Sequence, residues 1–311
     1  MTLVRRALVP ALVAVLSASA CAKRGAPADD VHAGHDTTAR IATVEMAHEM
    51  TMADSALPPD GDAALARLAA SPRHGEYAMI PVEGGDSVRA WVVYPERKTK
   101  APVVIVIHEI FGLSPWIRSV ADQLAADGFI AIAPDFLTGK PMPASADEAA
   151  NVPGAMDSIV SMIRTLDNAQ IVRRIGAAAR YGTSLPAATS RWGVVGFCWG
   201  GSNAFLSAAS FPTLSAAVPY YGAVQPAKMD LTKTKAAVLA LYGENDARVN
   251  ATIPAADSTL RIARVPFEKM IFPGAGHGFL RQQHGQNGAN GTAARQAWPR
   301  TIAWFRQHLE H

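Results

Sequence analysis

The sequence predicts an α/β domain with a mostly parallel central sheet and helices on both faces of the sheet. Beyond Arg73, short apolar runs alternate with longer helical stretches and turn residues, as in a chain of strand and helix units. The run 103–107 is continuously β-branched, which is typical of a strand buried on both faces. A chain of 311 residues, 49% of them hydrophobic, is also long and apolar enough to fill one large core.

The individual strands and helices follow one another along this part of the chain. Residues 77–80 and 88–93 are predicted to form an opening hairpin across Glu83-Gly84-Gly85-Asp86. Further strands are predicted at 103–107, 130–133, 193–197, 216–220, 237–242 and 270–272. Helices are predicted at 119–126, 156–175, 201–209, 253–263 and 293–308. We find no internal repeat.

Residues 1–20 have the pattern of a secretory signal peptide. Arg5 and Arg6 give a positive start, residues 7–16 form a short apolar run, and Ala18-Ser19-Ala20 offers small residues for cleavage. The apolar run is too short to span a bilayer comfortably as a permanent helix. We therefore expect an exported protein.

Cleavage after Ala20 would make Cys21 the first residue of the mature chain. This arrangement resembles a bacterial lipoprotein, in which that cysteine carries the lipid, although Ala18 stands where leucine is usual. A plain cleaved signal, with Cys21 as an incidental thiol, is the alternative. We expect a periplasmic protein or a membrane-anchored lipoprotein, with Cys21 as the lipidation site in the second case.

Residues 21–73 are predicted to be a tether between the signal and a catalytic domain at 74–311. The tether is rich in Ala, Asp, His, Met and Pro, has a turn-like break at residues 56–61, and ends in a short helix around 62–70. Histidine and methionine side chains could bind copper, but their spacing matches no compact ligand set, and flexible polar tethers often carry such residues without chemical purpose. These side chains are His32, His35, Met46, His48, Met50 and Met52.

The charge balance argues against a nucleic acid partner. The 29 basic and 26 acidic side chains give a formal net charge of only +3, and they form no block of like charges. The sequence thus carries no electrostatic surface for DNA or RNA.

Cys198 is the first candidate for chemistry. It lies in Gly196-Phe197-Cys198-Trp199-Gly200-Gly201, between a predicted strand and a predicted helix, as a nucleophile does in the sharp turn called the nucleophile elbow. The helix start would favour a thiolate, and the Trp199 amide could hold an oxyanion. If Cys21 is lipidated, Cys198 is an unpaired thiol in an oxidising compartment. The alternative is a small buried side chain beside a glycine-rich turn.

Two further residues complete a possible triad in the chain order nucleophile, acid, base. Asp246 follows the predicted strand 237–242, where it could accept the second ring N–H of a histidine. His277 lies in a glycine-rich loop after another strand and would be the general base. Glu244 is the rival acid, and both acids could also be ordinary solvated loop residues.

These motifs together resemble the dienelactone hydrolase family, whose members have the α/β-hydrolase fold. The resemblance rests on His108-Glu109-Ile110-Phe111-Gly112, the Gly-x-Cys-x-Gly-Gly elbow, Asp246 and Gly276-His277-Gly278-Phe279, in this order. It covers roughly residues 77–309, which is the whole predicted domain.

The resemblance implies a role for each matching residue. Cys198 would attack an acyl carbon, and Asp246 and His277 would complete the triad. Glu109 would contact the resting thiol and help to deprotonate it when substrate arrives, while the amides of Ile110 and Trp199 would form the oxyanion hole. A salt-bridged acid at the end of a strand is the alternative for Glu109.

The resemblance also implies substrate contacts. Arg281 matches an arginine that holds the substrate carboxylate, a task that suits a planar guanidinium group. The family's second substrate arginine has no clear match; Arg164 is the nearest candidate. Tyr220 or Tyr221 could line the pocket, although core packing is the commoner role for such rings.

The sequence therefore predicts a hydrolase that cleaves a lactone or ester through an acyl-cysteine intermediate. It implies no cofactor and no metal site, and it leaves the oligomeric state open. One alternative is an esterase or thioesterase for a larger substrate. Another is a lipid-anchored, non-catalytic binding or metal-handling protein on a hydrolase scaffold.

Overall fold

The computed structural model of the protein describes residues 56–142 and 148–310. The predicted signal peptide, Cys21 and the histidines and methionines of the predicted tether lie outside these residues. What was predicted for them stays a prediction.

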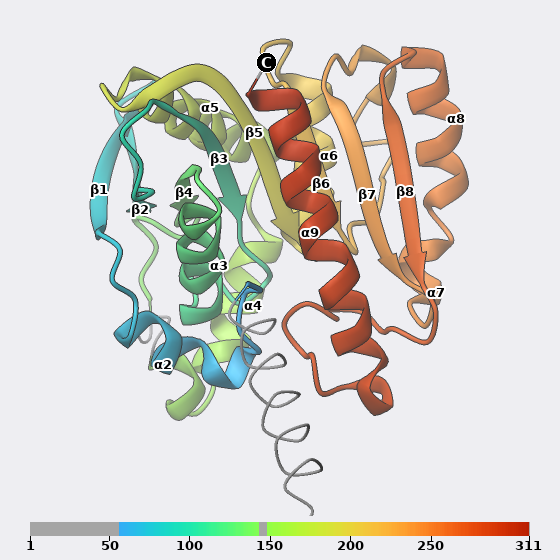
Figure 1. Ribbon diagram of the computed structural model, residues 1–311, viewed down its shortest axis with the longest axis horizontal. Coiled ribbons are helices and arrows are strands. Elements are labelled where there is room, and N and C mark those ends of the chain that lie inside the picture. Colours follow the sequence, from blue (N-terminus) through green and yellow to red (C-terminus); the bar gives the residue numbers. More distant parts are fainter. Residues whose placement is uncertain (1–55, 143–147, 311) are drawn as a thin grey trace, which may run out of the picture. The chain divides into compact units, whose positions relative to one another are not determined.

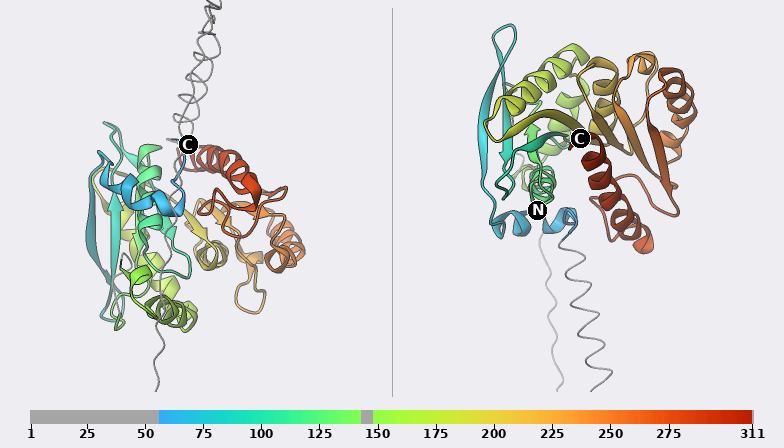
Figure 2. Two further views of the ribbon diagram at one scale, coloured as in Figure 1. Left: turned by 90° about the horizontal axis from the view of Figure 1, so that it is seen from below. Right: turned by 45° about the horizontal axis from the view of Figure 1, so that its top comes forward.

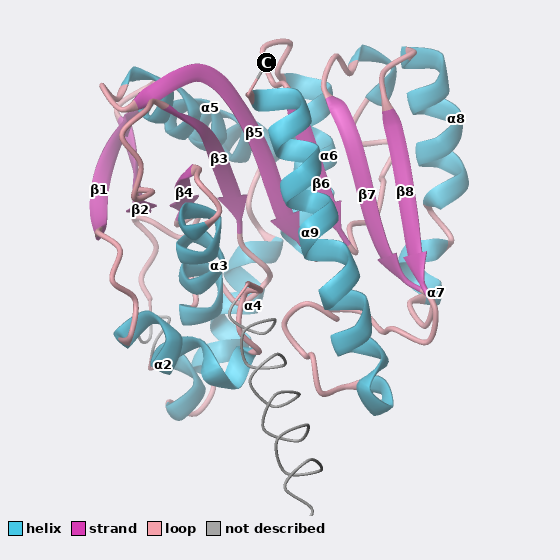
Figure 3. Ribbon diagram, in the orientation of Figure 1, coloured by secondary structure: helices cyan, strands magenta, loops and turns pink. Residues whose placement is uncertain are grey.

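A central sheet runs through the described part of the chain (Figure 3). Its strands, in sheet order, are β1 (Gly75–Val82), β2 (Asp86–Val93), β4 (Ile130–Pro134), β3 (Ala101–Ile107), β5 (Ala188–Phe197), β6 (Ala216–Tyr220), β7 (Ala237–Gly243) and β8 (Phe267–Phe272). β1 pairs antiparallel with β2, and β2 antiparallel with β4, whereas every other neighbouring pair is parallel. The predicted opening hairpin and mostly parallel sheet are confirmed.

Helices cover both faces of the sheet, as predicted. They are α2 (Ala64–Ala69), α3 (Pro115–Ala126), α4 (Ala155–Arg164), α5 (Asn168–Ser184), α6 (Trp199–Ser210), α7 (Ala247–Asn250), α8 (Ile253–Ala263) and α9 (Ala289–Leu309). α3 and α9 lie in front of the sheet in Figure 1, and Figure 2 shows α8 and α9 on opposite sides of β7 and β8. Within the described residues, no helix has the length and apolar character needed to cross a membrane.

The core has two halves because side chains alternate along each buried strand. In β3, Val104 and Val106 face the half that contains α3 and α9. Val103, Ile105 and Ile107 face the half that contains α5, α6 and α8. All residues of β3 are buried, since each face of the strand is covered by helices.

The parallel register brings the carboxyl ends of the central strands together. Ile107 of β3 pairs with Gly196 of β5, and Phe197 of β5 pairs with Tyr220 of β6. The residues that follow these strands therefore share one edge of the sheet, which lies at the bottom of Figure 1, where the strand arrows point. Ligands of open α/β sheets bind at this kind of edge.

The predicted helix 156–175 is wrong in one respect, because two helices occupy this region. α4 ends at Arg164, where the Thr165 hydroxyl donates to the Met162 carbonyl at 2.8 Å, and α5 begins after Asp167 in an extended conformation. The break allows α4 to pack in a separate small apolar cluster beside Leu137, while α5 packs on the sheet.

The described part of the predicted tether packs against the domain. Arg73 forms an ion pair with Asp122 of α3, at 2.6 Å between Nη2 and Oδ2. Ala64 of α2 is buried in the same core half as α3. The predicted short helix around 62–70 is present as a 3-10 turn at Gly61–Ala63 followed by α2.

Candidate active site

Cys198 sits at the tight turn between β5 and α6. Its backbone has φ 57° and ψ −113°, a conformation that is costly for a residue with a side chain. Its amide donates to the carbonyl of Tyr220 at 3.1 Å, which fixes the turn against β6. The sulfur is thereby held at the start of α6, and its residue is only half-buried.

The glycines of the turn are required by close backbone contacts. A Cβ on Gly196 would lie 2.0 Å from the carbonyl oxygen of Gly200. A Cβ on Gly200 would lie 2.2 Å from the carbonyl oxygen of Ile107, at the end of β3. The turn can therefore approach the end of β3 only because these two positions lack side chains.

Asp246 and His277 are brought together from two different loops. Nδ1 of His277 lies 2.5 Å from Oδ2 of Asp246. The other carboxylate oxygen of Asp246 accepts the backbone N–H of Val249 at 3.4 Å, at the start of α7. The acid is buried and has a partner on each oxygen, so its orientation toward the imidazole is fixed.

The imidazole of His277 also reaches the thiol. Burial lowers the pKa of His277, but hydrogen bonds with Asp246 and Cys198, together with the charges of both, outweigh burial and raise it to about 9. The side chains of Cys198, Asp246 and His277 thus meet at the carboxyl edge of the sheet. Glu244, the rival acid, is exposed and accepts the amide of Gly274 at 2.8 Å.

Glu109 lies beside this group, with Arg281 as its partner. Its Oε2 atom is 2.8 Å from Nε of Arg281, and its side chain is only 3% exposed. Burial raises the pKa of Glu109, while the positive charges of Arg281 and His277 oppose this effect. The guanidinium group of Arg281 also lies 4.7 Å from the ring centre of Phe111. Arg281, the arginine predicted to hold a substrate carboxylate, is therefore paired with Glu109, the acid predicted to help deprotonate the thiol.

The two tyrosines after β6 have different surroundings. Tyr220 is fully buried, and its hydroxyl forms a 2.6 Å hydrogen bond with the hydroxyl of Thr301 in α9, so it belongs to the core. Tyr221 lines the cavity that contains Cys198, and its ring centre is 5.0 Å from that of His277. Of the two rings named as candidates for the pocket, Tyr221 lines this cavity and Tyr220 packs in the core.

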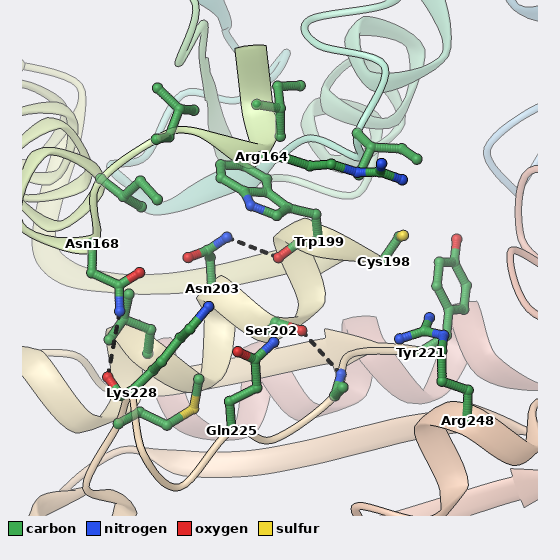
Figure 4. Close-up of a pocket in the computed structure, with 17 residues that line it drawn as sticks. Arg164, Asn168, Cys198, Trp199, Ser202, Asn203, Tyr221, Gln225, Lys228 and Arg248 are labelled. Carbon is green, nitrogen blue, oxygen red and sulfur yellow. Dashed lines mark hydrogen bonds between the residues drawn. The ribbon is translucent and has the colours of Figure 1, made fainter. Parts of the chain in front are cut away.

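A cavity of about 530 Å³ opens beside the sulfur (Figure 4). Ile110, Cys198 and Trp199 are among the residues that line it. Trp199 is the first residue of α6, so its amide has no carbonyl partner within the helix. The two residues predicted to supply oxyanion amides therefore flank the nucleophile at this cavity.

Among the described residues that line the same cavity, three are basic and none is acidic. They are Arg164 at the end of α4, Lys228 in the loop after β6, and Arg248 in α7. In Figure 4 Arg164 and Arg248 extend from opposite walls toward the end that holds Cys198. Sequence reasoning missed Lys228 and Arg248 and treated Arg164 only as a weak candidate, because nothing local in the sequence shows that these positions meet.

His108 was also missed as part of the site. Its ring is completely buried and stacks on the ring of Trp199 at a centroid distance of 5.4 Å. Its Nδ1 atom lies 2.7 Å from the carbonyl oxygen of Glu109, and its Nε2 atom accepts the amide of Phe136 at 3.4 Å. Burial lowers the pKa of His108, so this ring is neutral and supports the two neighbouring residues.

The described residues contain no group of three or more His, Cys, Asp or Glu side chains that could hold a metal ion.

A family model and several curated relatives match this chain, and they all indicate the same family. A family model described as "Dienelactone hydrolase family" matches residues 88–309. A Salmonella typhimurium protein named "Putative carboxymethylenebutenolidase" is 31% identical over 242 residues, which cover 74% of this chain and 86% of the relative. An Escherichia coli K12 protein of the same name is 30% identical over 245 residues, with coverage of 75% and 86%.

A solved structure resembles the fold over the same region. The crystal structure of a protein named "Putative Dienelactone Hydrolase" from Klebsiella pneumoniae has a TM-score of 0.65 and is 28% identical. The match covers 76% of this chain and 99% of the Klebsiella chain.

Proposed function

This chain belongs to the dienelactone hydrolase family, and we propose that it hydrolyses a small ester or lactone with Cys198 as its nucleophile. One observation carries the proposal. Cys198 lies at a cavity, Nδ1 of His277 is 2.5 Å from Oδ2 of Asp246, and both Asp246 and Cys198 raise the pKa of His277, as expected of a thiol beside the imidazole. A nucleophile, a base and an acid that orients the base are the parts that acyl transfer through a thiol requires.

In the proposed reaction, His277 takes the proton of the Cys198 thiol as the sulfur attacks the acyl carbon. The amides of Ile110 and Trp199 would stabilise the negative oxygen of the tetrahedral intermediate. When that intermediate collapses, the carbon–oxygen bond to the leaving group breaks, and His277 returns the proton to the leaving oxygen. Water then attacks the thioester, with His277 again as the base, and releases the acid and the free thiol.

Asp246 would keep the imidazole in one orientation and one tautomer. Its carboxylate accepts the Nδ1 proton of His277, which leaves Nε2 free to take the thiol proton. The same carboxylate stabilises the imidazolium that forms during attack. Stabilisation of the imidazolium by Asp246, together with Cys198, is what raises the pKa of His277 to about 9.

Glu109 would control when the thiol becomes reactive. The buried acid is paired with Arg281, so its charge is balanced before substrate arrives. A substrate with an acidic group could take Arg281 as its own partner, and the unpaired carboxylate of Glu109 would then help His277 to deprotonate the thiol. A neutral resting thiol is also less easily oxidised than a permanent thiolate.

The charge of the cavity supports an acidic substrate. None of Arg164, Lys228 and Arg248 has an ion pair with another described side chain, and the described residues that line the cavity include no acid. Each of these side chains is exposed, so each pairing with substrate would be worth at most about 1 kcal/mol, which is roughly a five-fold effect. We therefore propose that the substrate is a small ester or lactone that bears a carboxylate.

A pair of matched aryl esters tests this substrate charge. One ester has a butanoyl chain, and the other has a chain of the same length that ends in a carboxylate. We expect the replacement Arg248→Gln to lower kcat/KM for the acidic ester roughly two- to five-fold, mainly through KM, and to leave the neutral ester unchanged.

Arg261→Gln is the matched control, because it removes the same charge from the exposed face of α8, outside the cavity. Equal effects of the two replacements on both esters would mean that only the net charge of the protein matters. The proposal for Arg248 would then be wrong.

The larger-substrate alternative is tested by the same purified protein. A cavity of about 530 Å³ suits a small molecule, and pockets of this size hold compact ligands. We expect turnover of an enol-lactone and of small aryl esters, and weaker turnover of long-chain thioesters. A protein that binds these compounds but turns over none of them would contradict the hydrolase proposal and favour a binding role.

A further inference from the structure

A short N-terminal segment, residues 57–61, packs at the edge of the sheet where the site lies. This segment precedes residues 88–309, which match the family model. Leu57 is buried in the core half that contains α3 and α9. The indole N–H of Trp116 donates to the carbonyl of Pro59 at 3.0 Å. The segment is therefore an ordered part of the catalytic domain.

The same segment is hydrogen-bonded to the loop that follows His277. The amide of Gly61 donates to the carbonyl of Arg281 at 2.8 Å. The amide of Gln283 donates to Oδ2 of Asp60 at 2.7 Å, and the side-chain amide of Gln283 donates to the carbonyl of Pro58 at 2.9 Å. These bonds fix the backbone of the loop at residues 281 and 283.

Arg281 is held at both ends of its side chain. At the near end, a Cβ on Gly61 would lie 3.1 Å from Cγ of Arg281 and 3.3 Å from its carbonyl oxygen, so the two residues are in close contact. At the far end, Nε lies 2.8 Å from Oε2 of Glu109. A movement of residues 60 and 61 would therefore displace the arginine from the acid.

We propose that Asp60 and Gly61 are positioning residues, which hold Arg281 against Glu109. They thereby set the pH range in which Cys198 reacts. The inference rests on the proposed function, because Glu109 affects turnover only if the thiol beside it does the chemistry. It concerns a part of the chain that precedes the family match at residues 88–309.

The electrostatics of Glu109 give the sign of the expected effect. Its burial favours the protonated acid, and the charges of Arg281 and His277 favour the carboxylate. Burial and the negative charge of Glu109 both raise the pKa of the Tyr221 hydroxyl, so that hydroxyl stays protonated. Loosening Arg281 removes a positive charge, so Glu109 becomes protonated at higher pH.

Asp60→Ala tests the inference in a Cys21→Ala background, where Cys198 is the only thiol. The replacement removes the acceptor for the Gln283 amide. We expect the acidic limb of the kcat/KM profile to move to higher pH, with a loss of roughly three- to ten-fold on that limb and little loss at its alkaline end. The rate of alkylation of Cys198 by iodoacetamide should show the same shift, and this readout needs no substrate.

Two further variants separate positioning from folding. Asp60→Asn keeps an acceptor oxygen and should restore the wild-type profile. Gly61→Ala keeps the hydrogen bonds but crowds the stem of Arg281, and it should move the acidic limb in the same direction as Asp60→Ala.

Arg73→Ala is the matched control on the same stretch of chain. It breaks the ion pair with Asp122 of α3 and should lower the melting temperature without moving the pH profile. A wild-type profile in both Asp60→Ala and Gly61→Ala, or an equal shift in Arg73→Ala, would overturn the inference. Full activity of Cys198→Ala would instead overturn the proposed function, so the two failures are distinguishable.

Discussion

Replacing Cys198 with alanine is expected to lower kcat/KM for an enol-lactone or aryl ester by roughly four orders of magnitude or more. The sulfur is the group that attacks the substrate in the proposed reaction, and without it no acyl-enzyme can form. The remaining amides and imidazole could still bind substrate, so KM should change much less than kcat. Initial rates over a range of substrate concentrations measure both quantities.

The controls for this variant follow from the structure. Alanine is smaller than cysteine and has the same backbone restrictions, so the turn at φ 57° should form as before and the melting temperature should stay close to that of the wild type. Cys21→Ala removes the other cysteine and should leave the rates unchanged. Rates of Cys198→Ala that match the wild type would remove the sulfur from the mechanism.

Asp246→Asn is expected to lower kcat roughly 10³- to 10⁴-fold. The amide can still cap α7 by accepting the N–H of Val249 through its oxygen. Its NH₂ group would then face Nδ1 of His277, which must accept a hydrogen bond instead of donating one. The imidazole would carry its proton on Nε2, toward the thiol, and could no longer take the thiol proton.

The pH dependence of stability gives a second measure of this pair. In the folded protein the pKa of His277 is raised from 6.5 to about 9. The contribution of His277 to the free energy of unfolding is therefore complete below pH 6.5 and is lost as the pH rises through 9. Asp246→Asn should reduce this dependence, because the hydrogen bond with Asp246 is the largest of the causes that raise the pKa of His277. The difference in melting temperature from the wild type should therefore be largest near pH 6.5 and disappear above pH 9.

Glu244→Gln is the matched control for both measurements. Glu244 follows the same strand, but it is exposed and accepts the amide of Gly274 rather than contacting the imidazole. Glu244→Gln should keep nearly full activity. A large loss in this variant, with an active Asp246→Asn, would reverse the assignment of the acid.

The fold could be predicted from the sequence because the patterns that identify its strands and helices lie within short stretches of the chain. The continuous β-branched run of β3 and the alternation of strands and helices identify a buried parallel sheet. The meeting of Cys198, Asp246 and His277 could be anticipated from the same information, since each follows a strand of that sheet. The register of the parallel strands then places these three residues at one edge.

Other features could not be predicted because they depend on contacts between distant segments. Arg164 and Arg248 share a cavity only because α4 and α7 both lie at the carboxyl edge of the sheet. The pairing of Glu109 with Arg281 joins the ends of two loops that are far apart in sequence. The break between α4 and α5 likewise reflects how each helix packs, and helix propensity over 156–175 contains no such information.

The contact between Asp60 and Gln283 spans 223 residues of the chain, and this distance has a consequence for biogenesis. During synthesis residue 60 emerges long before residue 283. The hydrogen bond between them cannot form until nearly the entire domain has been made. Closing so large a loop is among the slowest kinds of step in folding. A nascent chain that ends before residue 283 therefore lacks this hydrogen bond, and the loop that bears His277, the proposed general base, is fixed only after that residue has been made.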